Sequence, residues 1–216
     1  MVYLTYDDGP DPGSTDLVLN ELKTLNVPAT FFVLGMFMQT PQEQQLIKDE
    51  YAQGHSVSVH GFTHGDMLKW RRITVVKELN TMTSLIPQLT GATPTCFRPP
   101  YGSYGKAVLV EAKRKNLRIQ LWSIDTEDWQ LPGVDKMMQT ISSQLVPGSV
   151  ILMHDGRGHG RIASEVTRRT VALAKSRGYE FGQLCPMTKP GETASPVPTP
   201  TSTGVPSGLT RPGAVS

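Results

Sequence analysis

Short apolar runs alternate with amphipathic stretches along the first 187 residues of the chain. The apolar runs predict strands at residues 2–6, 29–34, 55–60, 95–98, 118–123, 149–154 and 179–181. The stretches between them carry apolar side chains at helical spacing and predict helices at residues 15–25, 41–53, 71–89, 104–116, 134–145 and 162–177. Strands and helices therefore alternate through most of the sequence.

Strands separated by helices form βαβ units, and such units build a parallel sheet. Seven strands in so short a segment predict an α/β fold, namely a distorted, incomplete (β/α) barrel with about seven parallel strands. An open doubly wound sheet is the alternative that the same pattern allows. Residues 1–187 are expected to form one domain. Residues 188–216 are rich in Pro, Thr, Ser and Gly and contain no aromatic residue, which predicts a disordered linker or tail.

The composition of the chain argues against several classes of protein. The chain has 21 Lys and Arg against 19 Asp and Glu, a net charge of +2, which argues against nucleic-acid binding. No apolar run reaches the length of a membrane span, and no export signal is visible before the first strand. The only cysteines, Cys96 and Cys185, leave one disulfide or two buried thiols open, and we expect buried thiols.

Polar side chains gather where the predicted strands end. In parallel α/β folds the carboxyl ends of the strands converge on one face, and ligands bind there. Five strand ends carry such residues: Asp7 and Asp8; His60, followed by His64; Arg98; Asp125 and Asp128; and His154 with Asp155. We therefore expect these scattered positions to form one site.

Two histidines of this set have the spacing of metal ligands. His60 and His64 lie four residues apart, and imidazole is the commonest ligand for zinc and similar metals. Asp8 would complete a set of two histidines and one carboxylate, which suits zinc and also cobalt, nickel or iron. Gly9 and Pro10 break the strand, so both Asp7 and Asp8 can turn to the same site, where one could bind metal while the other remains free as a base.

A second histidine site is predicted at the end of the strand at residues 149–154. An aspartate at a neighbouring strand end, Asp125, would hold the imidazole of His154 in one tautomer and raise its pKa. A histidine held in this way can act as a general acid.

These residues resemble a known family. The segments TYDDGP (5–10), HGFTH (60–64), RPPYG (98–102), DTEDW (125–129) and LMH (152–154) are similar, in order, to the five motifs of the polysaccharide deacetylases. These are the carbohydrate esterases of family four, which include the nodulation-type chitooligosaccharide deacetylases. Gly61 departs from the pattern, because a Ser or Thr normally follows the first metal histidine and its hydroxyl braces the loop.

The resemblance implies a role for each motif residue. Asp7 would be the general base, oriented by Arg98, while Asp8, His60 and His64 would bind one divalent metal, most simply zinc, with cobalt or nickel as alternatives. His154 would be the general acid, supported by Asp125. The backbone N–H of Tyr101 would help to hold the oxyanion, and Trp129 and Leu152 would line the pocket for the acetyl methyl group.

The expected function is hydrolytic removal of N-acetyl groups from N-acetylglucosamine polymers, either chitin-type or peptidoglycan, by metal-activated water. An acetylxylan esterase that uses the same residues is one alternative, and an inactive glycan-binding module is another. The expected partner is an acetylated glycan, with no nucleic acid and no membrane span. We expect a monomer, secreted or associated with the cell wall and tethered through its tail to another module.

Overall fold

A computed structural model describes residues 1–192; residues 193–216, which include most of the predicted tail, lie outside the described residues. Seven parallel strands form one sheet in the order β5-β4-β3-β2-β1-β7-β6. The strands are β1 (Tyr3–Asp7), β2 (Thr30–Leu34), β3 (Ser56–Gly61), β4 (Cys96–Phe97), β5 (Arg118–Ile119), β6 (Ile124–Asp125) and β7 (Val150–His154).

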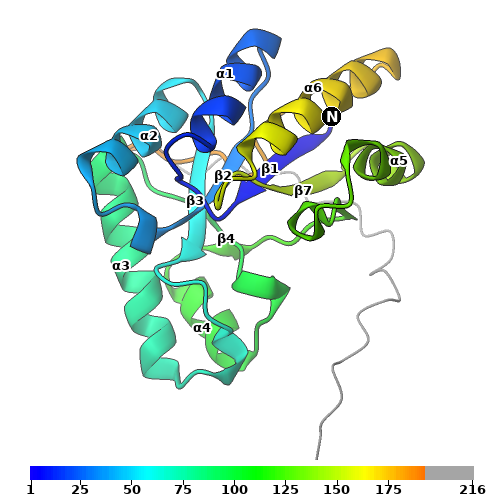
Figure 1. The fold of residues 1–216 in the computed structure, drawn as a ribbon. Helices are drawn as coiled ribbons and strands as arrows, with labels where there is room; N and C mark the ends of the chain where they lie inside the picture. Colours follow the sequence, from blue (N-terminus) through cyan, green and yellow to red (C-terminus); the bar gives the residue numbers. More distant parts are fainter. Residues whose placement is uncertain (193–216) are drawn as a thin grey trace, which may run out of the picture.

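In the described part of the chain, six α-helices lie along the outer side of the sheet (Figure 1). They are α1 (Thr15–Leu25), α2 (Pro41–Ala52), α3 (Arg72–Thr90), α4 (Lys106–Arg114), α5 (Val134–Gln144) and α6 (Gly160–Ser176). Helices α1 and α6 lie side by side, where Arg168 donates to Glu21 at 2.7 Å. Helix α2 begins with a capping box between Thr40 and Glu43 and has Pro41 in its first turn. None of the helices in the described part of the chain is long and apolar enough to cross a bilayer.

The sheet is curled into a half-barrel, and the connection between β5 and β6 demonstrates the curl. These strands stand at opposite ends of the sheet order, yet only residues 120–123 join them. Five residue steps span at most about 18 Å. Seven strands laid flat would separate the outer two by about 29 Å. The two edges therefore approach each other, which confirms the incomplete barrel and excludes the open doubly wound sheet.

The count of seven strands is confirmed, but their bounds differ from the prediction at two places. Of the strand predicted at residues 118–123, only residues 118–119 form a strand, β5, and a separate short strand, β6, follows at residues 124–125. Residues 179–181 contribute only an isolated bridge between Val2 and Phe181. Strands of two residues are too short for a period-two pattern, so the sequence could not separate them.

Alternation along β1 divides the core into two layers. Leu4 and Tyr6 belong to the large apolar cluster between sheet and helices. Tyr3 belongs to a smaller cluster with Phe32 and Val150, on the other face of the sheet. Successive side chains of a strand point to opposite faces, so Thr5 and Asp7 share the inner face with Tyr3. The inner face of the half-barrel therefore leads directly to Asp7 at its carboxyl end.

A disulfide joins Cys96 of β4 to Cys185, so the expectation of buried thiols is wrong. The segment after α6 returns beneath the sheet, where Arg118 donates to the carbonyl of Leu184 at 3.3 Å and Thr188 pairs with Thr93 through backbone hydrogen bonds. That return brings together two cysteines 89 residues apart, which spacing alone cannot reveal. Disulfides persist in oxidising environments, so the bond favours a location outside the cytoplasm.

Candidate active site

Asp7 and Arg98 form a buried ion pair at the carboxyl end of the half-barrel. Asp7 ends β1, and its Oδ1 accepts a hydrogen bond of 2.6 Å from Nη1 of Arg98, which is fully buried. The guanidinium also donates to Thr5 Oγ1, to the carbonyls of residues 120 and 121, and lies 4.0 Å above the ring of Phe32. Burial raises the pKa of Asp7, and Arg98 opposes that rise. The pair fixes the direction of the Asp7 carboxylate.

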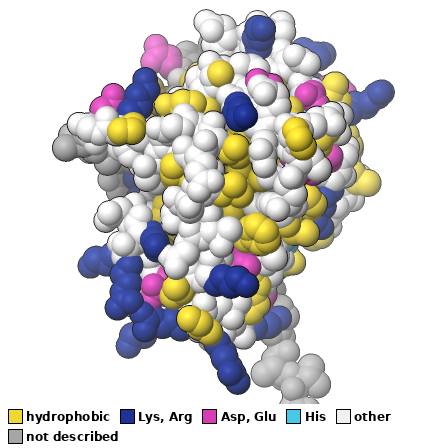
Figure 2. Space-filling view, turned by 90° about the vertical axis from the view of Figure 1, so that its left-hand side faces the viewer, with side chains coloured by type: hydrophobic (Ala, Val, Ile, Leu, Met, Phe, Trp, Pro, Cys, Tyr) yellow, Lys and Arg dark blue, Asp and Glu magenta, His cyan; other side chains and the backbone are white. Residues whose placement is uncertain are grey.

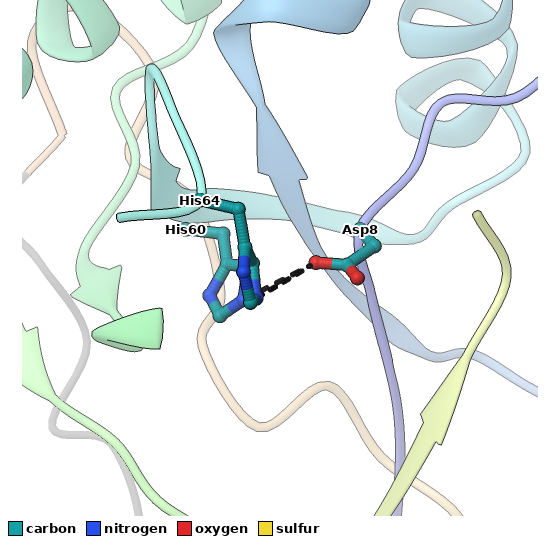
Figure 3. Close-up of side chains that lie close together, drawn as sticks. All are labelled: Asp8, His60 and His64. Carbon is teal, nitrogen blue, oxygen red and sulfur yellow. Dashed lines mark ion pairs between the residues drawn. The ribbon is translucent and has the colours of Figure 1, made fainter. Parts of the chain in front are cut away.

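Asp8, His60 and His64 converge in space, as Figure 3 shows. Oδ1 of Asp8 lies 3.5 Å from Nε2 of His60 and 3.3 Å from Nε2 of His64. Asp8 reaches this position because it follows the strand with a left-handed φ of 74°. Both aspartates of the pair therefore face the site, as predicted from the strand break at Gly9.

Both histidines favour the neutral form at this site, and His60 presents an unprotonated nitrogen to it. Nδ1 of His60 donates to the carbonyl of Arg98 at 2.7 Å, which leaves the lone pair on Nε2. Burial lowers the pKa of His60 to about 3 and also lowers the pKa of His64. The ring of His64 packs edge-on against Tyr101, with their centroids 4.6 Å apart.

The three side chains fit a divalent cation. Their candidate ligand atoms all lie within 4.8 Å of one another. Oδ1 of Asp8 is buried and has no hydrogen-bond partner, which is a costly arrangement for a carboxylate unless a cation satisfies it. The other oxygen, Oδ2, lies 3.4 Å from Nε of Arg157. A carboxylate with two imidazoles is a donor set that zinc accepts, and it leaves a coordination position open.

His154 ends β7 directly opposite Asp7 of β1 in the sheet register. Its Nδ1 donates to Oδ1 of Asp128 at 2.7 Å, and its backbone N–H donates to Oδ2 of the same carboxylate at 2.7 Å. Burial alone would lower the pKa of His154, but the hydrogen bond and charge of Asp128, with Asp7 and Asp8, raise it to about 9. The imidazole is therefore protonated at neutral pH.

Asp125, which the sequence assigned to His154, does not hydrogen-bond to it. Oδ1 of Asp125 accepts from the backbone N–H of Glu127 at 2.9 Å instead. Asp128 lies in a 3-10 turn, Asp128–Gln130, which aims its carboxylate at the end of β7. The assignment of Asp125 as the partner of His154 is therefore wrong, and the carboxylate that bonds to His154 is that of Asp128.

The three residues predicted to contact substrate occupy different depths. Tyr101 has a left-handed φ of 60° and is 64% exposed, with its hydroxyl 3.3 Å from the carbonyl of His64. Trp129 follows Asp128 and is 58% exposed. Leu152 is buried on β7 and, by alternation, shares a face with His154. Tyr101 and Trp129 thus stand on the surface around the polar centre, and Leu152 lies beneath it.

Arg157 is a residue beside the site that sequence reasoning missed. Its φ of 55° turns the side chain toward Asp8, and Gly156 permits the close approach because a Cβ there would overlap the backbone of Asp8. No sequence signal marks Arg157, since a single arginine in a glycine-rich loop is typical of any surface.

The surface view in Figure 2 carries acidic as well as basic side chains on one face, with Lys and Arg gathered toward its lower end. A continuous basic groove does not cross this face, which agrees with the net charge of +2.

Comparison with known proteins agrees with this geometry. The family model described as "Polysaccharide deacetylase" matches residues 1–119. A chitooligosaccharide deacetylase of Bradyrhizobium sp. (strain ANU 289) is 38% identical over 198 residues, which cover 85% of this chain and 88% of that protein. Among solved structures, the Bc1960 peptidoglycan N-acetylglucosamine deacetylase matches with a TM-score of 0.81 and 31% identity over 85% of each chain.

A second solved structure, a family 4 carbohydrate esterase from Streptomyces lividans in complex with acetate, has a TM-score of 0.78 and 30% identity. That alignment covers 85% of this chain and 92% of the other. The family model spans more than half of the chain, and the Bradyrhizobium protein aligns along most of its length. The chain therefore belongs to the polysaccharide deacetylase family, the carbohydrate esterases of family four.

Proposed function

We propose that this protein is a metal-dependent hydrolase that removes N-acetyl groups from N-acetylglucosamine residues of chitin-type glycans or peptidoglycan. One observation carries the proposal: Asp7 and His154 are register partners on β1 and β7, and Asp8, His60 and His64 converge beside them. A base, an acid and a candidate metal centre thus share one end of the half-barrel.

A divalent cation held by Asp8, His60 and His64, for which zinc is our first candidate, would act as a Lewis acid toward the acetyl carbonyl and toward water. Asp7 takes the proton from the attacking water, while Arg98 keeps its carboxylate in place. The backbone N–H of Tyr101 stabilises the oxyanion, a type of contact typically worth about 3 kcal/mol.

His154 gives a proton to the departing nitrogen, because an amine leaves poorly as an anion. The pKa of about 9 supports this role, since the group carries its proton at neutral pH. Trp129 and Leu152 line the pocket for the acetyl methyl group. Asp128 holds His154 in the tautomer that the transfer needs.

The proposed location is outside the cell or at the cell wall, supported by the Cys96–Cys185 disulfide. We propose that the protein acts as a monomer on an acetylated glycan. Residues 193–216 supply a candidate tether, and their composition supports that proposal.

Acetate release tests the function. The protein is stripped of metal with a chelator, reloaded with Zn²⁺, Co²⁺ or Ni²⁺, and assayed on chitooligosaccharides, peptidoglycan and acetylxylan. We expect release from one or both N-acetylglucosamine substrates, loss on stripping and recovery on reloading. Release from acetylxylan alone would identify an esterase, and no release from any substrate by metal-loaded protein would indicate a glycan-binding module.

The Asp7→Asn variant tests the assignment of the base. The amide keeps the shape of the side chain but cannot accept the proton, so we expect turnover to be abolished while metal content stays at the wild-type level. Turnover near the wild-type value would refute the role of Asp7.

A further inference from the structure

The carboxylate of Glu78 binds the loop that connects His60 to His64. Glu78 lies in α3, outside the five motifs, and is only 9% exposed. Its Oε2 accepts hydrogen bonds from the backbone N–H groups of Phe62 at 2.7 Å and Thr63 at 2.8 Å. Its Oε1 accepts a third, from the hydroxyl of Thr63 at 3.1 Å. Within residues 1–192 no basic side chain forms an ion pair with Glu78. All the described hydrogen bonds of its carboxylate go to this loop.

The two histidines are held in different ways, and this difference gives Glu78 its importance. His60 belongs to β3, and its Nδ1 is fixed by the carbonyl of Arg98. His64 lies beyond the strand, where its ring touches Tyr101 and its carbonyl accepts a long 3.3 Å hydrogen bond. Two adjacent peptide planes before His64 are fixed by one buried oxygen of Glu78. The position of His64 therefore depends on the bonds to Glu78.

Gly61 explains why a carboxylate from a helix is used. Its φ of 125° is a conformation that L side chains rarely adopt. A Cβ there would lie 2.9 Å from the carbonyl of Thr63 and 3.5 Å from Oε2 of Glu78. A serine or threonine at this position would therefore crowd the backbone of the loop, whereas the carboxylate of Glu78 would stay at an ordinary contact distance. In this chain position 61 has no hydroxyl to hydrogen-bond to the loop. The carboxylate of Glu78 makes those hydrogen bonds instead, to the backbone N–H groups of Phe62 and Thr63 and to the hydroxyl of Thr63.

We propose that Glu78 is a positioning residue that holds His64 in place to bind the metal. It takes over the bracing that a hydroxyl after the first metal histidine would give. The inference rests on the metal centre of the proposed function. Partners that orient a metal ligand typically contribute about 10–100-fold to metal affinity.

The test measures metal binding without substrate. Apo protein is titrated with Co²⁺ against a competing chelator, and the visible spectrum of bound Co²⁺ reports the ligand geometry. We expect Glu78→Ala to raise the dissociation constant about 10–100-fold and to change the spectrum. Glu78→Gln should have a smaller effect, because the amide oxygen still accepts from both backbone N–H groups. Thr63→Ala, which removes only the hydroxyl contact, should also have a smaller effect.

Glu111 offers a matched control. It is a buried glutamate on α4 that pairs with Arg72 of α3 at 2.6 Å and makes no described contact with the loop. Glu111→Ala should lower the free energy of unfolding without changing Co²⁺ affinity.

The inference would be overturned if folded Glu78→Ala bound Co²⁺ with the affinity and spectrum of the wild type. If that variant does not fold, wild-type affinity and spectrum in both Glu78→Gln and Thr63→Ala would overturn it. Failure of the wild-type protein to bind metal would instead overturn the proposed function.

Discussion

The Asp128→Asn variant tests whether Asp128 makes His154 an acid. The rise in the pKa of His154 from 6.5 to about 9 corresponds to about 3 kcal/mol in favour of the protonated form. The asparagine oxygen can still accept from the backbone N–H of His154, but its NH₂ group would face Nδ1. In the neutral form the ring of His154 would then carry its proton on Nε2. The negative charge of Asp128 would be lost, while burial would continue to lower the pKa of His154. We expect the pKa of His154 to fall to its ordinary value or below.

The assay is the pH dependence of kcat/KM for acetate release from a chitooligosaccharide. Protonated His154 is present below its pKa, so activity should be lost as pH rises through about 9 in the wild type. In Asp128→Asn this loss should begin about 2.5 pH units lower. At pH 8 the protonated fraction would fall from about 0.9 to about 0.03. An acetyl ester should lose less activity than the amide, because an alkoxide is a better leaving group.

Asp125→Asn is the matched control, since Asp125 stands on the same short segment without a hydrogen bond to His154. Its alkaline limb should stay close to that of the wild type. An unchanged alkaline limb in Asp128→Asn, or an equal shift in both variants, would refute the assignment of Asp128.

Other predictions concern the acid limb, the disulfide and the loop glycine. On the acid side, activity should rise with pH as Asp7 loses its proton, at a pH above the ordinary range of an aspartate because burial raises its pKa; a pH profile of kcat/KM checks this. Replacing Cys96 and Cys185 by alanine should lower the free energy of unfolding by about 4.6 kcal/mol, given a loop of 89 residues, and leave kcat/KM nearly unchanged under native conditions; urea unfolding with the acetate assay measures both. Gly61→Ser should cost about 1–3 kcal/mol in stability and weaken Co²⁺ binding, because φ at this position is 125°; tighter binding would contradict our account of the loop.

Much of the fold could be predicted because its signals are local and periodic. The five-residue strands β1, β2 and β7 are long enough to show an apolar run, and the polar residues at the ends of β1 and β7 mark one face of a parallel sheet. By that rule the sequence alone places Asp7, Asp8 and His154 together. The turn at Gly9 likewise predicted that two adjacent aspartates could face one site.

What could not be predicted depends on three-dimensional details without a local signal. Asp125 and Asp128 follow the same strand, and only the 3-10 turn after β6 decides which carboxylate points at β7. Glu78 lies among the buried residues of α3, and nothing in the spacing of that helix distinguishes it from a glutamate at the edge of an apolar face. Cys185 meets Cys96 only because the chain returns under the sheet after α6.

That return also determines how the protein can be attached to a larger assembly. Thr188 pairs with Thr93, which precedes β4, whereas Arg98 and the polar centre follow it. The described chain thus departs from the end of the half-barrel that is remote from the catalytic groups. The described chain therefore ends behind the open face, so a long polymer could cross that face without meeting the point at which the chain leaves the half-barrel.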